Sequence, residues 1–238
     1  GTRGQGPFSR ATLGSTSTAL LHHLDRPLLV VPGGGGDVGG PLVIGDTMYI
    51  HSPFPNKVFA ISLEDQSIRW KYEPKQDPSV IPVMCCDTVN RGPQVAGNIL
   101  IMGLADTTIV ALDTATGKEK WKQVNGDPKK GETYTGNLLI ANDKVVMGTS
   151  GAEFGVRCHV TAYSLADGKK LWRAYSMGPD SDILVDPEKT MSLGKPVGKD
   201  SSLKTWTGDP WTLGGGSTWG FYPYAPAVNL IYHGPGTP

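Results

Sequence analysis

The chain repeats itself at a fixed interval, and this repeat constrains its fold more than any other feature. Three segments superimpose without gaps, each running from Val or Ile through Ala to Trp: 58–70, 109–121 and 160–172. Consecutive tryptophans of the series lie 51 residues apart. A period of roughly 50 residues is typical of propellers and other arrays of stacked units.

Within each unit the local pattern predicts β-hairpins. Apolar residues flank a turn, and Gly117 and Gly168 stand where a hairpin needs a left-handed residue. Gln66 occupies this position in the first unit, which therefore departs from the pattern. Each unit follows another hairpin with a two-residue loop: Gly45-Asp46, Gly97-Asn98 and Asn142-Asp143. Four strands in about 50 residues predict one propeller blade.

The fold class is therefore predicted to be all-β, a β-propeller of four-stranded blades with tryptophans packed between neighbours. A solenoid of strand–helix units is the alternative, but no segment has sustained helical periodicity. A fourth unit begins near Tyr224, and a closed propeller needs about four to eight blades, so we expect part of a longer chain. Residues 38–238 are expected to form the partial propeller, with a long insertion at 178–218, and residues 1–37 to be irregular.

Composition narrows the function classes. Lys and Arg together number 22, and Asp and Glu together also number 22, so the formal net charge is zero. A zero net charge argues against a nucleic-acid partner bound through bulk charge. The three cysteines and five histidines lack the spacing of a zinc site. Two of the cysteines, Cys85 and Cys86, are neighbours. They are either two buried thiols or a bonded pair, and a bonded pair needs an oxidising compartment.

Several motifs carry a resemblance to a known family. Ala-Leu-Asp-Thr-Ala-Thr-Gly-Lys-Glu-Lys-Trp at 111–121 resembles the tryptophan-docking motif of dehydrogenases that use pyrroloquinoline quinone (PQQ). Val-Met-Cys-Cys-Asp-Thr-Val-Asn-Arg-Gly at 83–92 resembles the large subunit of PQQ-dependent methanol dehydrogenases, as do Gly-Thr-Ser-Gly-Ala-Glu-Phe-Gly-Val-Arg at 148–157 and Gly-Gly-Gly-Ser-Thr-Trp-Gly at 214–220. The insertion is most similar to the lanthanide-dependent branch.

The resemblance implies an eight-bladed propeller, of which this chain would be somewhat under half. It implies oxidation of a small primary alcohol, methanol above all, by hydride transfer to PQQ polarised by Ca²⁺ or a lanthanide ion. Electrons would pass to cytochrome c. The full-length protein would be periplasmic, as a homodimer or a complex with a small subunit. The catalytic base is expected beyond Pro238, so this chain alone is expected to be inactive.

The resemblance also assigns a cofactor site. A disulfide between Cys85 and Cys86 would lie against one face of PQQ, and Trp219 would stack on the other. Arg91 matches the family's arginine beside the cofactor, although alone it would read as a surface ion pair with Asp87. Trp219 alone would read as a tryptophan that packs between blades. The residues that match donors around the cofactor rim are Thr135, Ser150, Gly151, Ala152 and Ser217.

For the metal, the resemblance points to Glu153, because hard cations prefer oxygen ligands. In isolation this residue would read as a solvated loop glutamate. Thr237 stands at the position of the family's metal-binding asparagine, Val38 replaces a rim glutamate, and Cys158 replaces a usual glycine. Two alternatives remain: a non-catalytic periplasmic propeller scaffold with the same repeat, and a PQQ ethanol dehydrogenase.

Overall fold

The computed structural model describes residues 40–85 and 87–236, which contain three four-stranded antiparallel sheets. In each sheet the strands lie side by side in chain order. The first sheet contains β1 (Leu42–Ile44), β2 (Thr47–His51), β3 (Val58–Ser62) and β4 (Ile68–Tyr72). The second contains β5 (Gln94–Ala96), β6 (Ile99–Gly103), β7 (Thr108–Asp113) and β8 (Glu119–Val124). The third contains β9 (Leu139–Ala141), β10 (Lys144–Met147), β11 (His159–Ser164) and β12 (Lys170–Tyr175).

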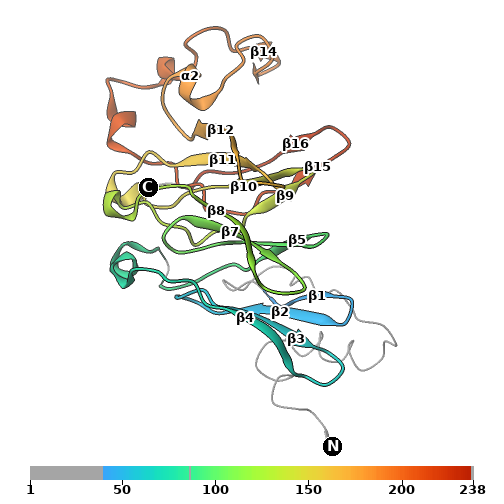
Figure 1. Cartoon of the computed structure of the whole chain (residues 1–238). Coiled ribbons are helices and arrows are strands. Elements are labelled where there is room, and N and C mark those ends of the chain that lie inside the picture. The colour runs from blue at the N-terminus through green and yellow to red at the C-terminus, as the bar shows by residue number, and fades with distance from the viewer. Residues whose placement is uncertain (1–39, 86, 237–238) are drawn as a thin grey trace, which may run out of the picture.

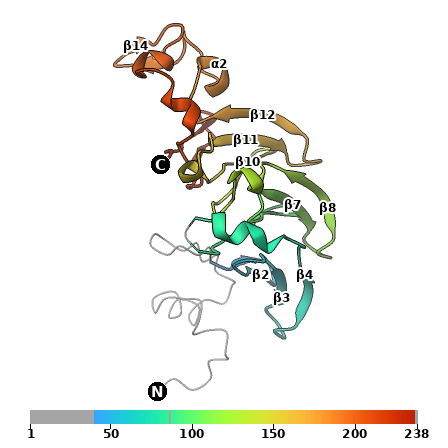
Figure 2. The same ribbon diagram turned by 90° about the vertical axis from the view of Figure 1, so that its left-hand side faces the viewer.

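The three sheets are stacked one above another, as Figure 1 shows. In the view turned by 90°, the last strands of the three sheets, β4, β8 and β12, lie along the same edge of the stack (Figure 2). Repetition of four-stranded units in this way is the architecture of consecutive propeller blades. The predicted all-β propeller fold is confirmed.

The hairpin loops follow the sequence prediction. The loops Gly45-Asp46, Gly97-Asn98 and Asn142-Asp143 join the first two strands of each sheet. Gly117 and Gly168 are left-handed, with φ of 68° and 73°. Gln66 takes the same conformation with φ of 62°, so the first unit departs from the pattern in residue type but not in backbone.

Two hydrophobic cores lie on the two faces of the second sheet. Leu100 and Met102 of β6 pack into the core shared with the first sheet. Ile101, between them, points to the opposite core, shared with the third sheet. Successive strand residues point to opposite faces, so β6 must be apolar at every position because both its faces are covered.

The repeated tryptophans connect neighbouring sheets. The indole N–H of Trp70 donates to the carbonyl of Thr114 at 2.8 Å, and that of Trp121 donates to Leu165 at 2.9 Å. Each acceptor lies in the β-turn of the next sheet. A Cβ on Gly168 would stand 2.6 Å from the ring of Trp121, so the turn needs glycine for contact as well as for its dihedrals. Trp172, the third of the series, is 37% exposed.

After β12 the chain leaves the stack, in what we call the excursion (residues 177–213), seen at the top of Figure 1. Residues 214–218 return to the third sheet, and a last hairpin follows. No helix among the described residues has the length and apolar character to cross a membrane. The excursion contains α2 (Asp180–Ile183), β13 (Met191–Ser192), β14 (Lys195–Pro196), η4 (Leu203–Thr205) and η5 (Pro210–Leu213), and the hairpin is β15 (Tyr224–Ala225) and β16 (Leu230–Ile231). Three short 3₁₀ helices lie in connections between strands: η1 (Pro78–Val83), η2 (Pro128–Lys130) and η3 (Ala152–Phe154).

Candidate functional site

The predicted site residues come from four connections between strands. Cys85 and Arg91 lie between β4 and β5, and Thr135 lies between β8 and β9. The connection from β10 to β11 carries Ser150 and the residues that follow it. The fourth connection, between the excursion and β15, carries Ser217 and Trp219. Cys86, Thr237 and Val38 lie outside the described residues.

Arg91 joins two of these connections. Its side chain is buried, with the residue only 5% exposed, and Nη1 donates to the carbonyl of Thr135. Its guanidinium lies 4.6 Å from the ring centroid of Trp219, a cation–π contact. Arg91 is therefore not a surface residue. A flat ligand stacked on Trp219 would take the face that the guanidinium leaves free, or displace the guanidinium.

Thr133 connects two further parts of the site. Its backbone pairs with that of Ser150 in an isolated antiparallel bridge, with N–H···O distances of 3.2 and 2.9 Å. Its hydroxyl donates to the carbonyl of Val83, two residues before Cys85, at 3.4 Å. Cys85 is disulfide-bonded, whereas Cys158 is a buried free thiol. The pairing of Cys85 with Cys86 stays a prediction.

Thr149 and Thr218 hold the third and fourth connections together. The N–H of Thr218 donates to the carbonyl of Thr149 at 2.8 Å, and the N–H of Thr149 donates to the Thr218 hydroxyl at 2.9 Å. Ser150 and Trp219 directly follow these two threonines. A Cβ on Gly148 would overlap the Thr218 carbonyl, so the close approach requires glycine there.

The site contains two buried hydroxyls without a partner. The Oγ1 of Thr135 and the Oγ of Ser150 make no hydrogen bond to any described residue. An unmet buried polar group costs about 1–3 kcal/mol, so such a group needs an explanation. A bound molecule rich in acceptors would supply it, and a buried arginine next to Thr135 favours an anionic one. These residues fit the carboxylates and carbonyls of PQQ.

Glu153 lies in the first turn of η3, between two left-handed glycines, Gly151 and Gly155, with φ of 119° and 80°. Its side chain is exposed and Ala152 beside it is buried. Among residues 40–85 and 87–236 no three His, Cys, Asp or Glu side chains gather as a metal site. Glu153 can offer one carboxylate to a cation, and further ligands would have to come from elsewhere.

Ser217 is 5% exposed and lies beside Cys158, with Sγ and Oγ 3.8 Å apart. Its carbonyl accepts from the N–H of Gly236 at 2.7 Å, next to the predicted metal position 237. Burial raises the pKa of the Cys158 thiol, so it is a neutral apolar group here. The departure from glycine at this position is accommodated inside the core.

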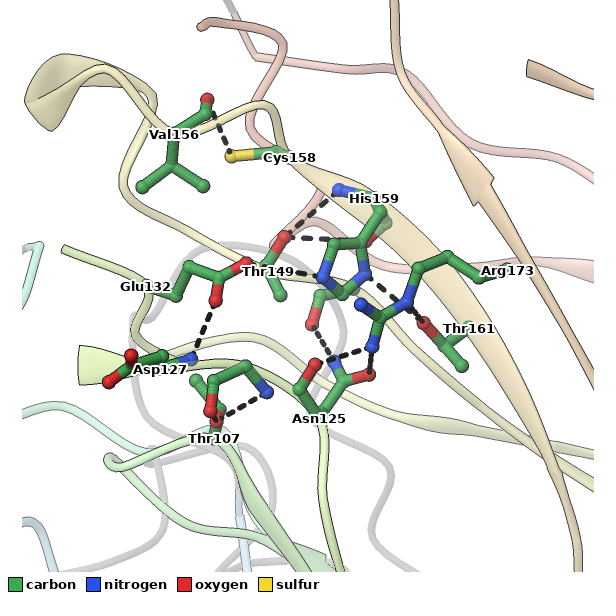
Figure 3. A network of polar contacts seen from close by, with 12 residues as sticks. Thr107, Asn125, Asp127, Glu132, Thr149, Val156, Cys158, His159, Thr161 and Arg173 are labelled. Atoms are coloured by element: carbon green, nitrogen blue, oxygen red, sulfur yellow. Dashed lines mark hydrogen bonds and ion pairs between the residues drawn. The ribbon is translucent and has the colours of Figure 1, made fainter. Parts of the chain in front are cut away.

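A buried polar network beneath the site was not predicted (Figure 3). His159, fully buried, contacts Glu132 at 3.3 Å through Nε2 and Thr161 at 3.1 Å through Nδ1. Arg173 donates from Nε to the Thr161 hydroxyl at 3.0 Å and from Nη2 to the Asn125 carbonyl at 2.5 Å. The contacts of His159 with Glu132 and of Arg173 with Asn125 join residues far apart in sequence, so no motif indicates them.

The same histidine supports the pair of threonines. The backbone N–H of His159 donates to the Thr149 hydroxyl at 3.0 Å, and its backbone carbonyl accepts from the Thr218 hydroxyl at 2.7 Å. Burial lowers the pKa of His159. Burial alone would raise the pKa of Glu132, but the contacts with His159 and the Asp127 N–H lower it. A neutral imidazole thus lies beside an anionic carboxylate under the site.

Comparison with known proteins matches the chain to one family model, to curated relatives and to a solved structure. The PQQ_2 family model, described as outer membrane protein assembly factor BamB, matches residues 80–203. A lanthanide-dependent methanol dehydrogenase of Methylorubrum extorquens is 61% identical over 204 residues, 85% of this chain and 34% of that protein. Methanol dehydrogenase [cytochrome c] subunit 1 of Paracoccus denitrificans is 44% identical over 232 residues, 94% of this chain and 34% of that protein.

A solved structure, a europium-containing methanol dehydrogenase, superimposes with a TM-score of 0.79 at 45% identity. The match covers 88% of this chain and 37% of that one. This chain therefore spans about a third of the length of the curated relatives it matches.

Proposed function

The chain belongs to the PQQ_2 family and is homologous to the lanthanide-dependent methanol dehydrogenases, and from this premise we propose that it is part of a quinoprotein that oxidises methanol with PQQ and a lanthanide ion. The observation that carries the proposal is the pair of unpartnered buried hydroxyls, Thr135 Oγ1 and Ser150 Oγ, together with the buried Arg91 that donates to the Thr135 carbonyl. They offer donors and positive charge where a tricarboxylate would bind.

Each residue has a role in binding. Arg91 would pair with a carboxylate of PQQ while the hydroxyls of Thr135 and Ser150 donate to its rim. The indole of Trp219 would provide one apolar wall, and the disulfide of Cys85 the other. Further rim contacts are assigned to Gly151, Ala152 and Ser217.

Glu153 would contribute a carboxylate to the cation, Ca²⁺ or a lanthanide, with Thr237 as a further candidate ligand. When bound, PQQ would supply a quinone that accepts hydride from the alcohol, and the cation would polarise it as a Lewis acid. The residues of this chain bind and orient these groups and exclude water from them. We assign no catalytic base within this chain.

The partners follow from the same proposal. The substrate would be methanol or another small primary alcohol, and a cytochrome c would accept the electrons. The full-length protein would work in the periplasm, where a disulfide at Cys85 is stable. We propose a homodimer or a complex with a small subunit as its oligomeric form.

The description of the matching family favours one alternative, a non-catalytic periplasmic scaffold. A scaffold needs neither the buried arginine nor the two unpartnered hydroxyls. A PQQ ethanol dehydrogenase would share the cofactor site and differ in alcohol preference.

The deciding experiment is an assay of the full-length protein with PQQ and either La³⁺ or Ca²⁺, using methanol, ethanol and an artificial electron acceptor. We expect quinone absorbance in the purified protein and methanol oxidation. Absence of both with either metal would support the scaffold, and a preference for ethanol would support the second alternative.

Two variants test the binding site itself. Ser150→Ala and Thr135→Val each remove a donor to an anionic ligand, a loss of about 1.5–3 kcal/mol or about 10–100-fold in PQQ affinity. Neither variant should unfold the protein, because each hydroxyl lacks a partner among the described residues. Ser67→Ala removes an exposed hydroxyl in the turn between β3 and β4, where it donates to Asp65, and is the control. Unchanged PQQ affinity in both site variants would refute the assignment.

A further inference from the structure

Arg157 lies where the loop of Glu153 meets the segment that leads to Trp219. Its backbone forms a parallel bridge with Gly215. The N–H of Gly215 donates to the carbonyl of Val156 at 2.9 Å, and the N–H of Cys158 donates to the carbonyl of Gly215 at 3.3 Å. The loop that carries Glu153 and the segment that leads to Trp219 are therefore held together by backbone hydrogen bonds around Arg157 and Gly215.

The side chain of Arg157 points into the excursion and contacts both of its ends. Nη2 donates to the carbonyl of Met177 at 3.0 Å and to Oδ2 of Asp182 at 2.8 Å, near the beginning. The guanidinium lies 4.5 Å from the ring centroid of Tyr175 and 4.7 Å from that of Trp211. Trp211 lies in η5, three residues before the glycine run. One planar cation thus connects the beginning and the end of the excursion.

Two glycines beside these contacts lie where a side chain would not fit. Gly178 is left-handed with φ of 123°, and a Cβ there would overlap Nη2 of Arg157. Gly214 is left-handed with φ of 97°, and a Cβ there would overlap the backbone of Gly155. Glycine occurs at both positions because backbone and guanidinium approach closely.

We propose that Arg157 is a positioning residue, which sets the distance between the Glu153 loop and the Trp219 segment by clamping both ends of the excursion. The inference rests on the proposed function, in which Glu153 binds the cation and Trp219 stacks on the quinone. Arg157 acts on both through the backbone and through Asp182 and Trp211. The excursion is thereby part of the cofactor site's support.

Arginine is needed here, not merely a positive charge. Its planar guanidinium stacks on aromatic rings while its N–H groups bind a carboxylate and a carbonyl. A lysine at position 157 would keep the ion pair with Asp182 but lose the stacking between Tyr175 and Trp211. The Arg157→Lys variant therefore separates charge from shape.

The test compares Arg157→Lys and Arg157→Ala with Arg69→Ala in the full-length protein. Arg69 makes an ion pair with Asp46 at 2.6 Å on the first sheet and touches no part of the site. Amide hydrogen exchange without added cofactor should accelerate by about tenfold or more in peptides covering 151–158 and 214–219. Affinity for Eu³⁺, measured by its luminescence, should fall by about tenfold or more. Arg157→Lys should lie between Arg157→Ala and the wild type, and Arg69→Ala should match the wild type.

Faster exchange confined to 177–213, with unchanged Eu³⁺ affinity, would overturn the proposal, because Arg157 would then only tether the excursion. If Arg157→Ala does not fold, Asp182→Asn and Trp211→Leu test the two arms of the clamp by the same measurements, and wild-type behaviour in both would overturn it. If the wild type binds neither PQQ nor Eu³⁺ while the exchange pattern changes as expected, the proposed function fails and the clamp is supported.

Discussion

Substituting Gly168 by alanine tests how neighbouring sheets are held together. At Gly168 φ is +73°, and the new Cβ would stand 2.6 Å from Cε3 of Trp121. Gly198 in the excursion has nearly the same φ, +74°, with no heavy atom within 4 Å of the corresponding position. Both alanine variants carry the penalty of a left-handed residue, about 1–2 kcal/mol, but only Gly168→Ala must also move the indole.

Displacing Trp121 has a cost that the structure defines. The hydrogen bond from its Nε1 to the Leu165 carbonyl, 2.9 Å, contributes about 1 kcal/mol. Loss of packing around a partly buried ring adds about 1–2 kcal/mol. We therefore expect Gly168→Ala to lower the free energy of unfolding by about 3–5 kcal/mol and Gly198→Ala by about 1–2 kcal/mol.

The assay is denaturant unfolding of the full-length protein, followed by tryptophan fluorescence and by circular dichroism. The difference between the two variants carries the test, because the backbone penalty cancels in it. Equal losses of stability would refute the conclusion that the turn receives the indole of the preceding sheet.

Two further predictions concern titratable groups. Burial lowers the pKa of His159 in the folded protein below the ordinary value of 6.5, which the unfolded chain keeps. Between the folded-state pKa and about pH 6.5 the unfolded chain therefore binds more protons than the folded one. The contribution of neutral His159 to stability is fully present above about pH 6.5 and is lost as the pH falls. His159→Gln should therefore lose less stability than the wild type between about pH 7.5 and about pH 5.5, and equal losses in denaturant titrations would contradict this. Cys158 is buried with a raised pKa and Cys85 is disulfide-bonded, so iodoacetamide should modify neither in the native protein and Cys158 alone after denaturation without reductant. Mass spectrometry of the peptides checks this, and alkylated Cys85 or Cys86 in the non-reduced sample would count against the predicted bond.

The sequence predicts the blades because their determinants are local. A two-residue loop such as Gly45-Asp46 fixes its hairpin through the dihedrals of its own residues. Gln66 shows the limit of this reasoning: its residue type argues against a left-handed turn, yet the flanking strand pairing imposes one. The glycines at the equivalent positions of the other two units, Gly117 and Gly168, predict the backbone conformation of Gln66 better than its own residue type does.

The site is predicted only where the resemblance supplies residues. Arg91 and Trp219 are 128 positions apart, and no periodicity indicates that guanidinium and indole lie 4.6 Å from each other. The contact of His159 with Glu132 was missed for the same reason, because a single histidine and a loop glutamate carry no spacing signal. Such contacts depend on the packing of whole sheets, which becomes visible only in three dimensions.

The direction of the tryptophan contacts has a consequence for how such molecules could be enlarged. Trp70 and Trp121 each reach forward to the turn of the following sheet, never backward. A duplicated stretch of 51 residues would thus bring both a tryptophan that bonds to the turn of the following unit and a turn that accepts the tryptophan of the preceding unit. An extra copy would therefore meet the same kind of border on both sides, so duplication of this stretch is a route to a different number of blades.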